Sequence, residues 1–134
     1  MANRRVLIDT NVVVRFLVRD HEEHYLESVE IFRSIEAGKL EAMLMDFIMA
    51  EIVYVLSRIY KIEKRQIASA LKRLLFYKSL YTDNKLITFE ALDIYGSRNI
   101  DFADALLCAK QNLEGFEIVS FDKDIGRCTE EAGR

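Results

Sequence analysis

Four acidic residues stand at positions where a carboxylate is suited to binding a ligand. Asp9 directly follows the short apolar run of residues 6–8, and Asp122 follows a second apolar run near the end of the chain. An acid at the carboxyl end of a buried strand lies where open α/β sheets bind their ligands. Glu51 interrupts an apolar helical stripe, and Asp104 falls in the first turn of a predicted helix. Carboxylates brought to one point from four segments predict a cation site.

The predicted cation is Mg²⁺ or Mn²⁺. Two carboxylates 4 Å apart repel each other by roughly 4 kcal/mol at an effective dielectric constant of about 20, and a divalent cation removes that penalty. Oxygen ligands without neighbouring His or Cys favour these hard cations over zinc. His21 and His24 lie outside the acidic motifs in the sequence, which argues further against zinc.

Each of these acids also has a structural explanation. Asp101 is expected to cap a helix whose N-terminus Asp104 supports electrostatically. Asp122 is typical of a turn that follows a strand, and Asp124 is an ordinary turn residue. Taken singly, none of the acids decides between structure and chemistry, and the coincidence of four favours a site.

The elements that must position these acids follow from hydrophobic periodicity. Short apolar runs predict strands at residues 6–8, 40–45, 85–88 and 117–121. Helices are predicted at residues 10–18, 20–37, 47–60, 63–79 and 89–95, and a further helix starts at Asp101. Thr10 is the predicted N-cap of the first helix, and Gly38 and Gly96 are predicted to end the second and the fifth. Strands separated by helices predict a three-layer α/β fold with a mostly parallel sheet.

Glu51 is predicted to lie on the apolar face of the helix at residues 47–60, beside Phe47 and Tyr54. A buried carboxylate needs compensation. Apart from a metal ion, Arg15 and Arg58 are candidate partners.

The composition limits the possible domain organisation, location and partners of the chain. The chain has 134 residues, 51% of them hydrophobic and 31% charged, with a net charge of −3, so we expect one globular domain over residues 1–134. It contains no apolar run long enough for a bilayer and no signal-peptide pattern. Two distant cysteines without metal-type spacing are expected to be reduced thiols in the cytoplasm. A nucleic-acid partner would need a local basic patch or metal ions.

Four motifs together resemble a known family. Residues 8–17 (IDTNVVVRFL), 50–56 (AEIVYVL), 101–106 (DFADAL) and 119–124 (VSFDKD) resemble, in order, the motifs of PIN-domain nucleases and in particular those of VapC toxins of toxin–antitoxin pairs. The resemblance covers nearly the whole chain. It implies a three-layer α/β/α PIN-like fold and a Mg²⁺-dependent (or Mn²⁺-dependent) endoribonuclease. It also implies a homodimer and a small antitoxin protein that covers the active-site groove.

The resemblance also assigns the site. Asp9, Glu51, Asp104 and Asp122 match the acidic quartet that holds the metal and carries catalysis. Asn11 matches the Asn that supports the first acid. Ser120 stands where the family usually has Thr, which keeps the hydroxyl group, and Asp124 is a substitute for the last acid.

The leading hypothesis is therefore metal-assisted hydrolysis of an RNA phosphodiester by water. Candidate phosphate contacts are basic residues that also suit solvated helix faces: Arg4, Arg15, Arg19, Lys61, Lys64, Arg65 and Lys123. One alternative is a PIN-like module that binds RNA or protein without cutting. A receiver-type phosphoacceptor is less favoured because basic residues precede the first strand. The sequence does not identify the RNA, the antitoxin or the number of metal ions.

Overall fold

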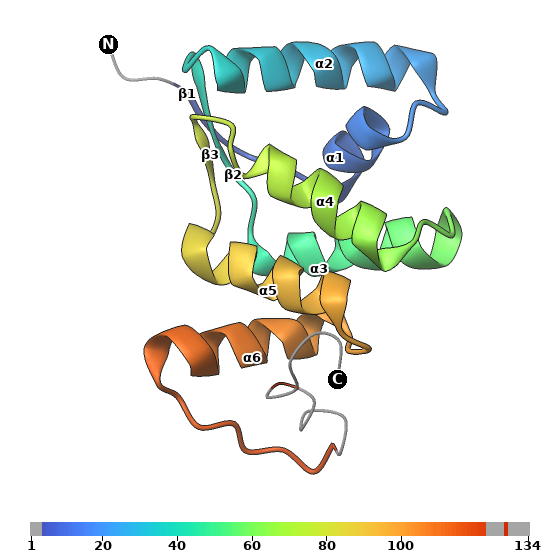
Figure 1. Cartoon of the computed structure of the whole chain (residues 1–134). Coiled ribbons are helices and arrows are strands. Elements are labelled where there is room, and N and C mark those ends of the chain that lie inside the picture. Colours follow the sequence, from blue (N-terminus) through green and yellow to red (C-terminus); the bar gives the residue numbers. More distant parts are fainter. Residues whose placement is uncertain (1–3, 123–127, 129–134) are drawn as a thin grey trace.

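The structure is a computed structural model and describes residues 4–122 and 128. Its elements, in chain order, are β1 (Arg4–Leu7), α1 (Thr10–Leu17), α2 (Glu22–Glu36), β2 (Leu40–Met43), α3 (Asp46–Tyr54), the π-helical turn η1 (Val55–Ile59), α4 (Lys64–Leu74), β3 (Leu80–Tyr81), α5 (Lys85–Ser97) and α6 (Phe102–Glu114) (Figure 1). Among the described residues, no helix combines the length and the apolar character that crossing a membrane requires.

The sheet is parallel, with β2 between β1 and β3. Val6 of β1 is in register with Ala42 of β2, which is in register with Leu80 of β3. Since all three strands run the same way, their carboxyl ends share one edge. Asp9 follows β1 by two residues and therefore lies at that edge.

One sheet face forms the core. Leu40, Ala42 and Leu80 are buried there, and α2 packs along β2. The largest fully buried side chains come from both helices and strands and include Phe32, Ile35, Leu44, Met49, Ile52, Leu71 and Leu92. The parallel sheet with its helices confirms the predicted α/β/α class.

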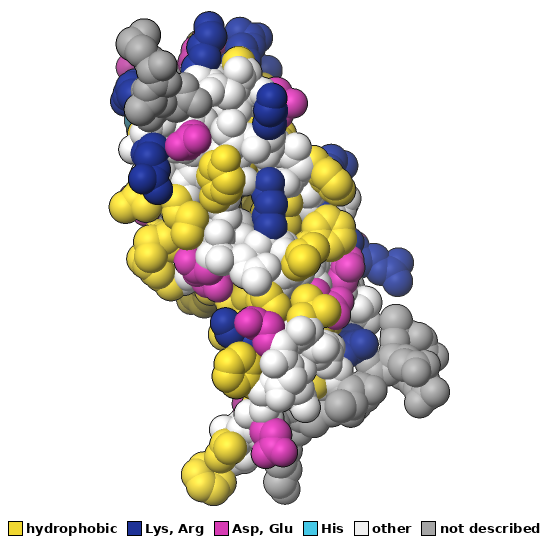
Figure 2. Space-filling view, turned by 90° about the vertical axis from the view of Figure 1, so that its left-hand side faces the viewer, with side chains coloured by type: hydrophobic (Ala, Val, Ile, Leu, Met, Phe, Trp, Pro, Cys, Tyr) yellow, Lys and Arg dark blue, Asp and Glu magenta, His cyan; other side chains and the backbone are white. Residues whose placement is uncertain are grey.

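The opposite sheet face is open to solvent in part. Leu7 and Met43 point to this side with Tyr81, and Leu7 is 73% exposed. Together with Arg5 and Glu41, they line a pocket of about 590 Å³. Figure 2 shows hydrophobic side chains exposed on the side of the molecule where the strands lie in Figure 1. We call Arg5, Leu7, Glu41, Met43 and Tyr81 the open sheet face.

Two strand predictions were wrong. Residues 85–88 form the first turn of α5, because the Asn84 side chain accepts hydrogen bonds from Leu86 N and Ile87 N and so caps a helix there. The strand before that helix is Leu80–Tyr81, which was missed. Residues 117–121 pair with none of the strands in the described part of the chain, and Val119 is 94% exposed. A strand needs an adjacent strand, which apolar composition cannot guarantee.

Of the three predicted helix-boundary residues, Thr10, Gly38 and Gly96, two differ from the structure. Thr10 is the first residue of α1, and Asp9 caps it by accepting a hydrogen bond from Thr10 N at 2.8 Å. Gly96 does not end α5; a Cβ built on it would lie 2.8 Å from Ala68 Cβ, so it allows α5 to approach α4 closely. Gly38, with φ +77°, follows α2 as predicted.

The prediction of free thiols was wrong. Cys108 of α6 and Cys128 form a disulfide, with their Cα atoms 5.2 Å apart. Both residues are buried. The chain after α6 returns to that helix, and a separation of 20 residues in sequence does not reveal such a return.

Candidate active site

Asp9 and Glu51 are brought together through Thr10. Asp9 Oδ1 accepts from Thr10 N at 2.8 Å, and the Thr10 hydroxyl donates to Glu51 Oε2 at 2.7 Å. The strand-to-helix junction after β1 therefore holds one acid and fixes the other, which comes from α3. Sequence reasoning treated Thr10 only as a cap and missed this link; a hydroxyl beside a strand-end acid was the available signal.

Glu51 does not lie in an apolar interior. The buried residues of α3 are Met49, Ile52 and Val53, and Glu51 is on the exposed side. Neither Arg15 nor Arg58 forms an ion pair with it within the described ranges 4–122 and 128. The prediction of a buried carboxylate was wrong, because Glu51 lies on the solvent-exposed side of α3.

The donor set at this junction fits a hard cation. Asp9 and Glu51 supply only carboxylate oxygens, and neither has an ion-pair partner in the described part of the chain. Carboxylates left without a cationic side chain are suitable ligands for Mg²⁺ or Mn²⁺. However, no group of three or more His, Cys, Asp or Glu side chains suited to one metal ion occurs among the described residues.

The other two predicted acids do not complete such a group. Asp104 lies in the first turn of α6, half-buried, and α6 makes a small contact with α3. Asp122 is exposed at the end of the unpaired segment 117–121, where its N–H donates to Ser120 Oγ at 2.9 Å. Asp101 occupies the N-cap position of α6, but its side chain makes no capping hydrogen bond, contrary to its preferred role. Asp124 lies outside the described residues.

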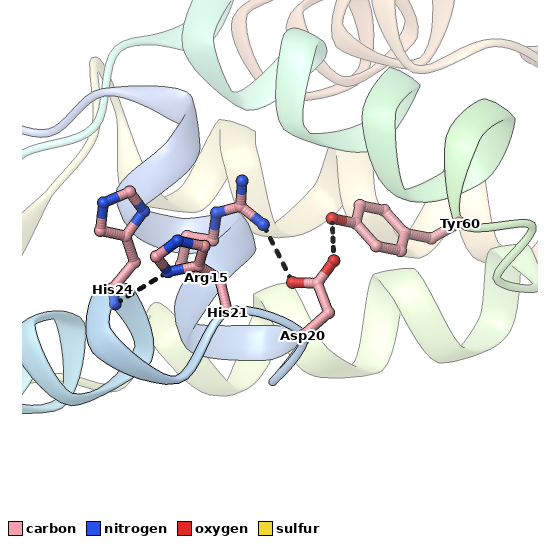
Figure 3. A network of polar contacts seen from close by, with 5 residues as sticks. All are labelled: Arg15, Asp20, His21, His24 and Tyr60. Carbon is pink, nitrogen blue, oxygen red and sulfur yellow. Dashed lines mark hydrogen bonds and ion pairs between the residues drawn. The ribbon is translucent and has the colours of Figure 1, made fainter.

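A polar network joins Arg15 of α1 to Tyr60, the residue after η1, through Asp20 (Figure 3). Arg15 Nη1 donates to Asp20 Oδ1 at 3.0 Å, and the Tyr60 hydroxyl donates to Asp20 Oδ2 at 2.7 Å. The hydrogen bond from Tyr60 lowers the pKa of Asp20, and Arg15 lowers it further. Arg15 is thus held by Asp20 and does not reach Glu51.

Two histidines stand beside this network. The rings of His21 and His24 stack with centroids 4.0 Å apart, and His21 Nδ1 accepts from His24 N at the start of α2. These contacts are local, and the one from His21 caps α2.

Other predicted phosphate contacts are engaged locally. Arg19 pairs with Glu22 at 2.6 Å, and Lys64 Nζ donates to the backbone oxygens of Arg98 and Ile100. Burial lowers the pKa of Lys64. These contacts suit structural roles for Arg19 and Lys64, which is the alternative to a phosphate contact. Lys123 lies outside the described residues.

A second acidic pair was missed. Asp46, the first residue of α3, and Asp83, which follows β3 by two residues, lie together at the carboxyl edge of the sheet, and Asp46 N donates to Asp83 Oδ2 at 2.9 Å. Burial and the neighbouring Asp83 raise the pKa of Asp46 to about 6. The shared feature that would have revealed the pair is an acid following each strand.

Comparison with known proteins assigns the family. The model of the PIN domain matches residues 6–131. The chain belongs to the PIN-domain family. It is also 30% identical over 119 residues to a VapC ribonuclease of Aquifex aeolicus (strain VF5), an alignment that covers 87% of each chain. The resemblance of the four motifs is confirmed, and this PIN domain is VapC-like.

The Asp9–Thr10–Glu51 junction lies within the region that matches the PIN domain. The matched region begins inside β1 and extends past α6, so it includes the elements that carry all four predicted acids. The described geometry unites two of them. The roles of the four acids remain predictions.

Proposed function

We propose that this PIN domain is a Mg²⁺-dependent or Mn²⁺-dependent endoribonuclease, active in the cytoplasm as the toxin of a toxin–antitoxin pair. The observation that carries the proposal is the junction at which Asp9 and Glu51 are linked through Thr10, with no cationic side-chain partner for either acid among the described residues. The VapC ribonuclease that the chain resembles supports RNA as the substrate.

Asp9 and Glu51 are the residues that would hold the cation first. When bound, such a cation polarises a phosphate and lowers the pKa of a coordinated water. Thr10 restricts the Glu51 carboxylate to one orientation through its hydroxyl group, while its backbone N–H orients Asp9. This preorganisation leaves the reacting groups less freedom to lose during the reaction. Asn11, exposed in the first turn of α1, is proposed to support Asp9 by hydrogen bonding.

We include Asp104 and Asp122 in the proposed site. β1 is an edge strand, and the segment 117–121 is extended, apolar and without a strand partner in the described structure. Parallel addition of this segment to the free edge of β1 would bring Asp122 to the edge where Asp9 lies. The contact of α6 with α3 supports a place for Asp104 near Glu51.

The test is cleavage of a fluorescent RNA by Asp9→Asn and Glu51→Gln proteins with added Mg²⁺. Each substitution removes a charged ligand and is expected to lower kcat/KM by about 100-fold or more, which corresponds to roughly 2.7 kcal/mol. Glu30→Gln is a matched control, because Glu30 is exposed on α2 and pairs with Arg33 of the same helix. Undiminished cleavage by Asp9→Asn would exclude this site.

A second candidate is a PIN module that binds RNA without cutting it. The absence of a three-acid metal group among residues 4–122 and 128 favours this alternative. Calorimetric titration of Mg²⁺ separates the two functions when it is run alongside the cleavage assay. RNA binding without turnover at saturating metal would favour the module.

The proposal extends to a homodimer and a small antitoxin partner. Its support is the likeness to VapC toxins together with exposed apolar side chains such as Leu86 and Phe76, each 76% exposed. Light scattering of the isolated protein measures the oligomeric state directly. A strictly monomeric protein at all concentrations would contradict the dimer.

A further inference from the structure

The exposed side of α3 carries a regular pattern that the metal site does not explain. Phe47, Glu51, Tyr54 and Arg58 follow one another at separations of four, three and four residues, which is the spacing of one helical face. All four are exposed, and the two rings are 64% and 61% exposed. We call these four residues the α3 stripe. It continues from α3 into the π-helical turn η1, which contains Arg58.

Core packing does not account for the two rings. The buried side of α3 consists of Met49, Ile52 and Val53, so the helix is already anchored through its other face. In the described structure, neither Phe47 nor Tyr54 takes part in a ring–ring or cation–π contact. Two flat apolar surfaces therefore remain available to a ligand.

The position of the rings ties them to the candidate active site. Glu51 lies between them, and its carboxylate is fixed by the Thr10 hydroxyl beside Asp9. Each ring is about one helical turn, roughly 5.4 Å along the axis, from Glu51. A phosphate bound at the Asp9–Glu51 junction would have its flanking nucleotides on either side of Glu51, within reach of Phe47 and Tyr54.

This inference rests on the proposed function: we propose that Phe47 and Tyr54 are stacking positions for unpaired bases of single-stranded RNA, one on each side of the bound phosphate. Aromatic rings bind the faces of splayed-out bases, and bases inside a duplex do not offer those faces. Arg58, at the end of the stripe, contacts the RNA backbone.

The position of the rings favours RNA as their occupant. Glu51, which lies between them, has no ion-pair partner within the described residues, so an occupant that buried it would have to supply a cation. Bases stacked on the rings leave the carboxylate facing the phosphate and the cation of the proposed site.

The experiment compares Phe47→Leu, Tyr54→Leu and the double variant with the unmodified chain. The probe is a single-stranded RNA containing 2-aminopurine, whose fluorescence falls on stacking, and the same strand annealed to its complement. Each leucine variant is expected to weaken single-strand binding, and to raise KM, by about 5-fold to 150-fold, which corresponds to 1–3 kcal/mol of stacking per base. Quenching should be lost with little change in kcat.

Two further variants serve as controls. Phe116→Leu removes a ring that is 58% exposed just after α6, and it should leave binding unchanged. Tyr54→Phe keeps the ring and should restore most of the affinity that Tyr54→Leu loses. Thermal melting of each variant checks that the fold is intact.

Three outcomes would overturn the inference: unchanged single-strand affinity in the double variant, an equal loss for duplex RNA, or unchanged RNA binding with conversion of a dimer to a monomer. Failure of the proposed function would give a different result. In that case the unmodified chain would not cleave RNA, or the Asp9→Asn protein would cleave it normally. The quenching assay measures binding and does not depend on cleavage, so it tests the two rings separately.

Discussion

Ionisation of Asp46 lowers the free energy of unfolding, so its effect on stability depends on pH. Burial and Asp83 raise its pKa from an ordinary 3.8 to about 6, against the opposing effect of Lys110, and its Oδ1 atom is buried without a hydrogen-bond partner in the described structure. Between pH 3.8 and about 6 the folded protein therefore binds more protons at this residue than the unfolded chain does. Its contribution to the free energy of unfolding falls as pH rises through this window.

Asp46→Asn should remove that pH dependence. We expect the variant to exceed the unmodified chain in stability at pH 7 by on the order of 1 kcal/mol, a value reduced for solvent screening at a half-exposed group. Urea unfolding at pH 4, 5, 6 and 7 measures the effect, with Glu30→Gln as an exposed control. Parallel pH profiles for Asp46→Asn and the unmodified chain would contradict the assignment.

At the residue scale, sequence reasoning identified Asp9 and Glu51 but not what joins them. Strand-end position pointed to Asp9, whereas the Thr10 hydroxyl bond to Glu51 spans 41 residues and depends on how α3 docks. Asp122 illustrates the converse case. Its position after an apolar run was read correctly, but the run is unpaired in the structure, so proximity to Asp9 remains a prediction.

At the scale of the elements, the close approach of α4 and α5 depends on Gly96. A Cβ at this position would lie 2.8 Å from Ala68 Cβ, so Gly96→Ala should force the helices apart and destabilise the fold by about 1–3 kcal/mol. Urea unfolding measures this loss. Ala68→Gly in the same chain makes room and should restore part of it, and strictly additive effects would contradict a direct contact.

Helices were predicted more completely than strands. The 3.6-residue period located α1, α2, α3, α4 and α6, because each buries one face. Gly96 was read as a helix stop because sequence alone cannot distinguish a terminating glycine from one at a helix crossing. The two-residue strand β3 escaped detection since a run this short has no period, and its place is defined by pairing with β2.

At the scale of the whole molecule, the Cys108–Cys128 disulfide ties the end of the chain to α6. Closing a loop of 20 residues should stabilise the folded protein by about 3 kcal/mol through the entropy of the unfolded chain. We expect reduction with dithiothreitol to lower the unfolding free energy by that order. Thiol titration under denaturing conditions provides the control, and two free thiols before reduction would contradict the bond.

The open sheet face has a consequence for how the stability of this PIN domain is to be understood. A molecule that covered Leu7, Met43 and Tyr81 in the folded chain alone would add to the free energy of unfolding by mass action. The gain is about 2.7 kcal/mol when the covering molecule is present at 100 times its dissociation constant. The melting temperature is then a function of concentration and of binding partners, and a value measured on the dilute, isolated chain is its lower limit.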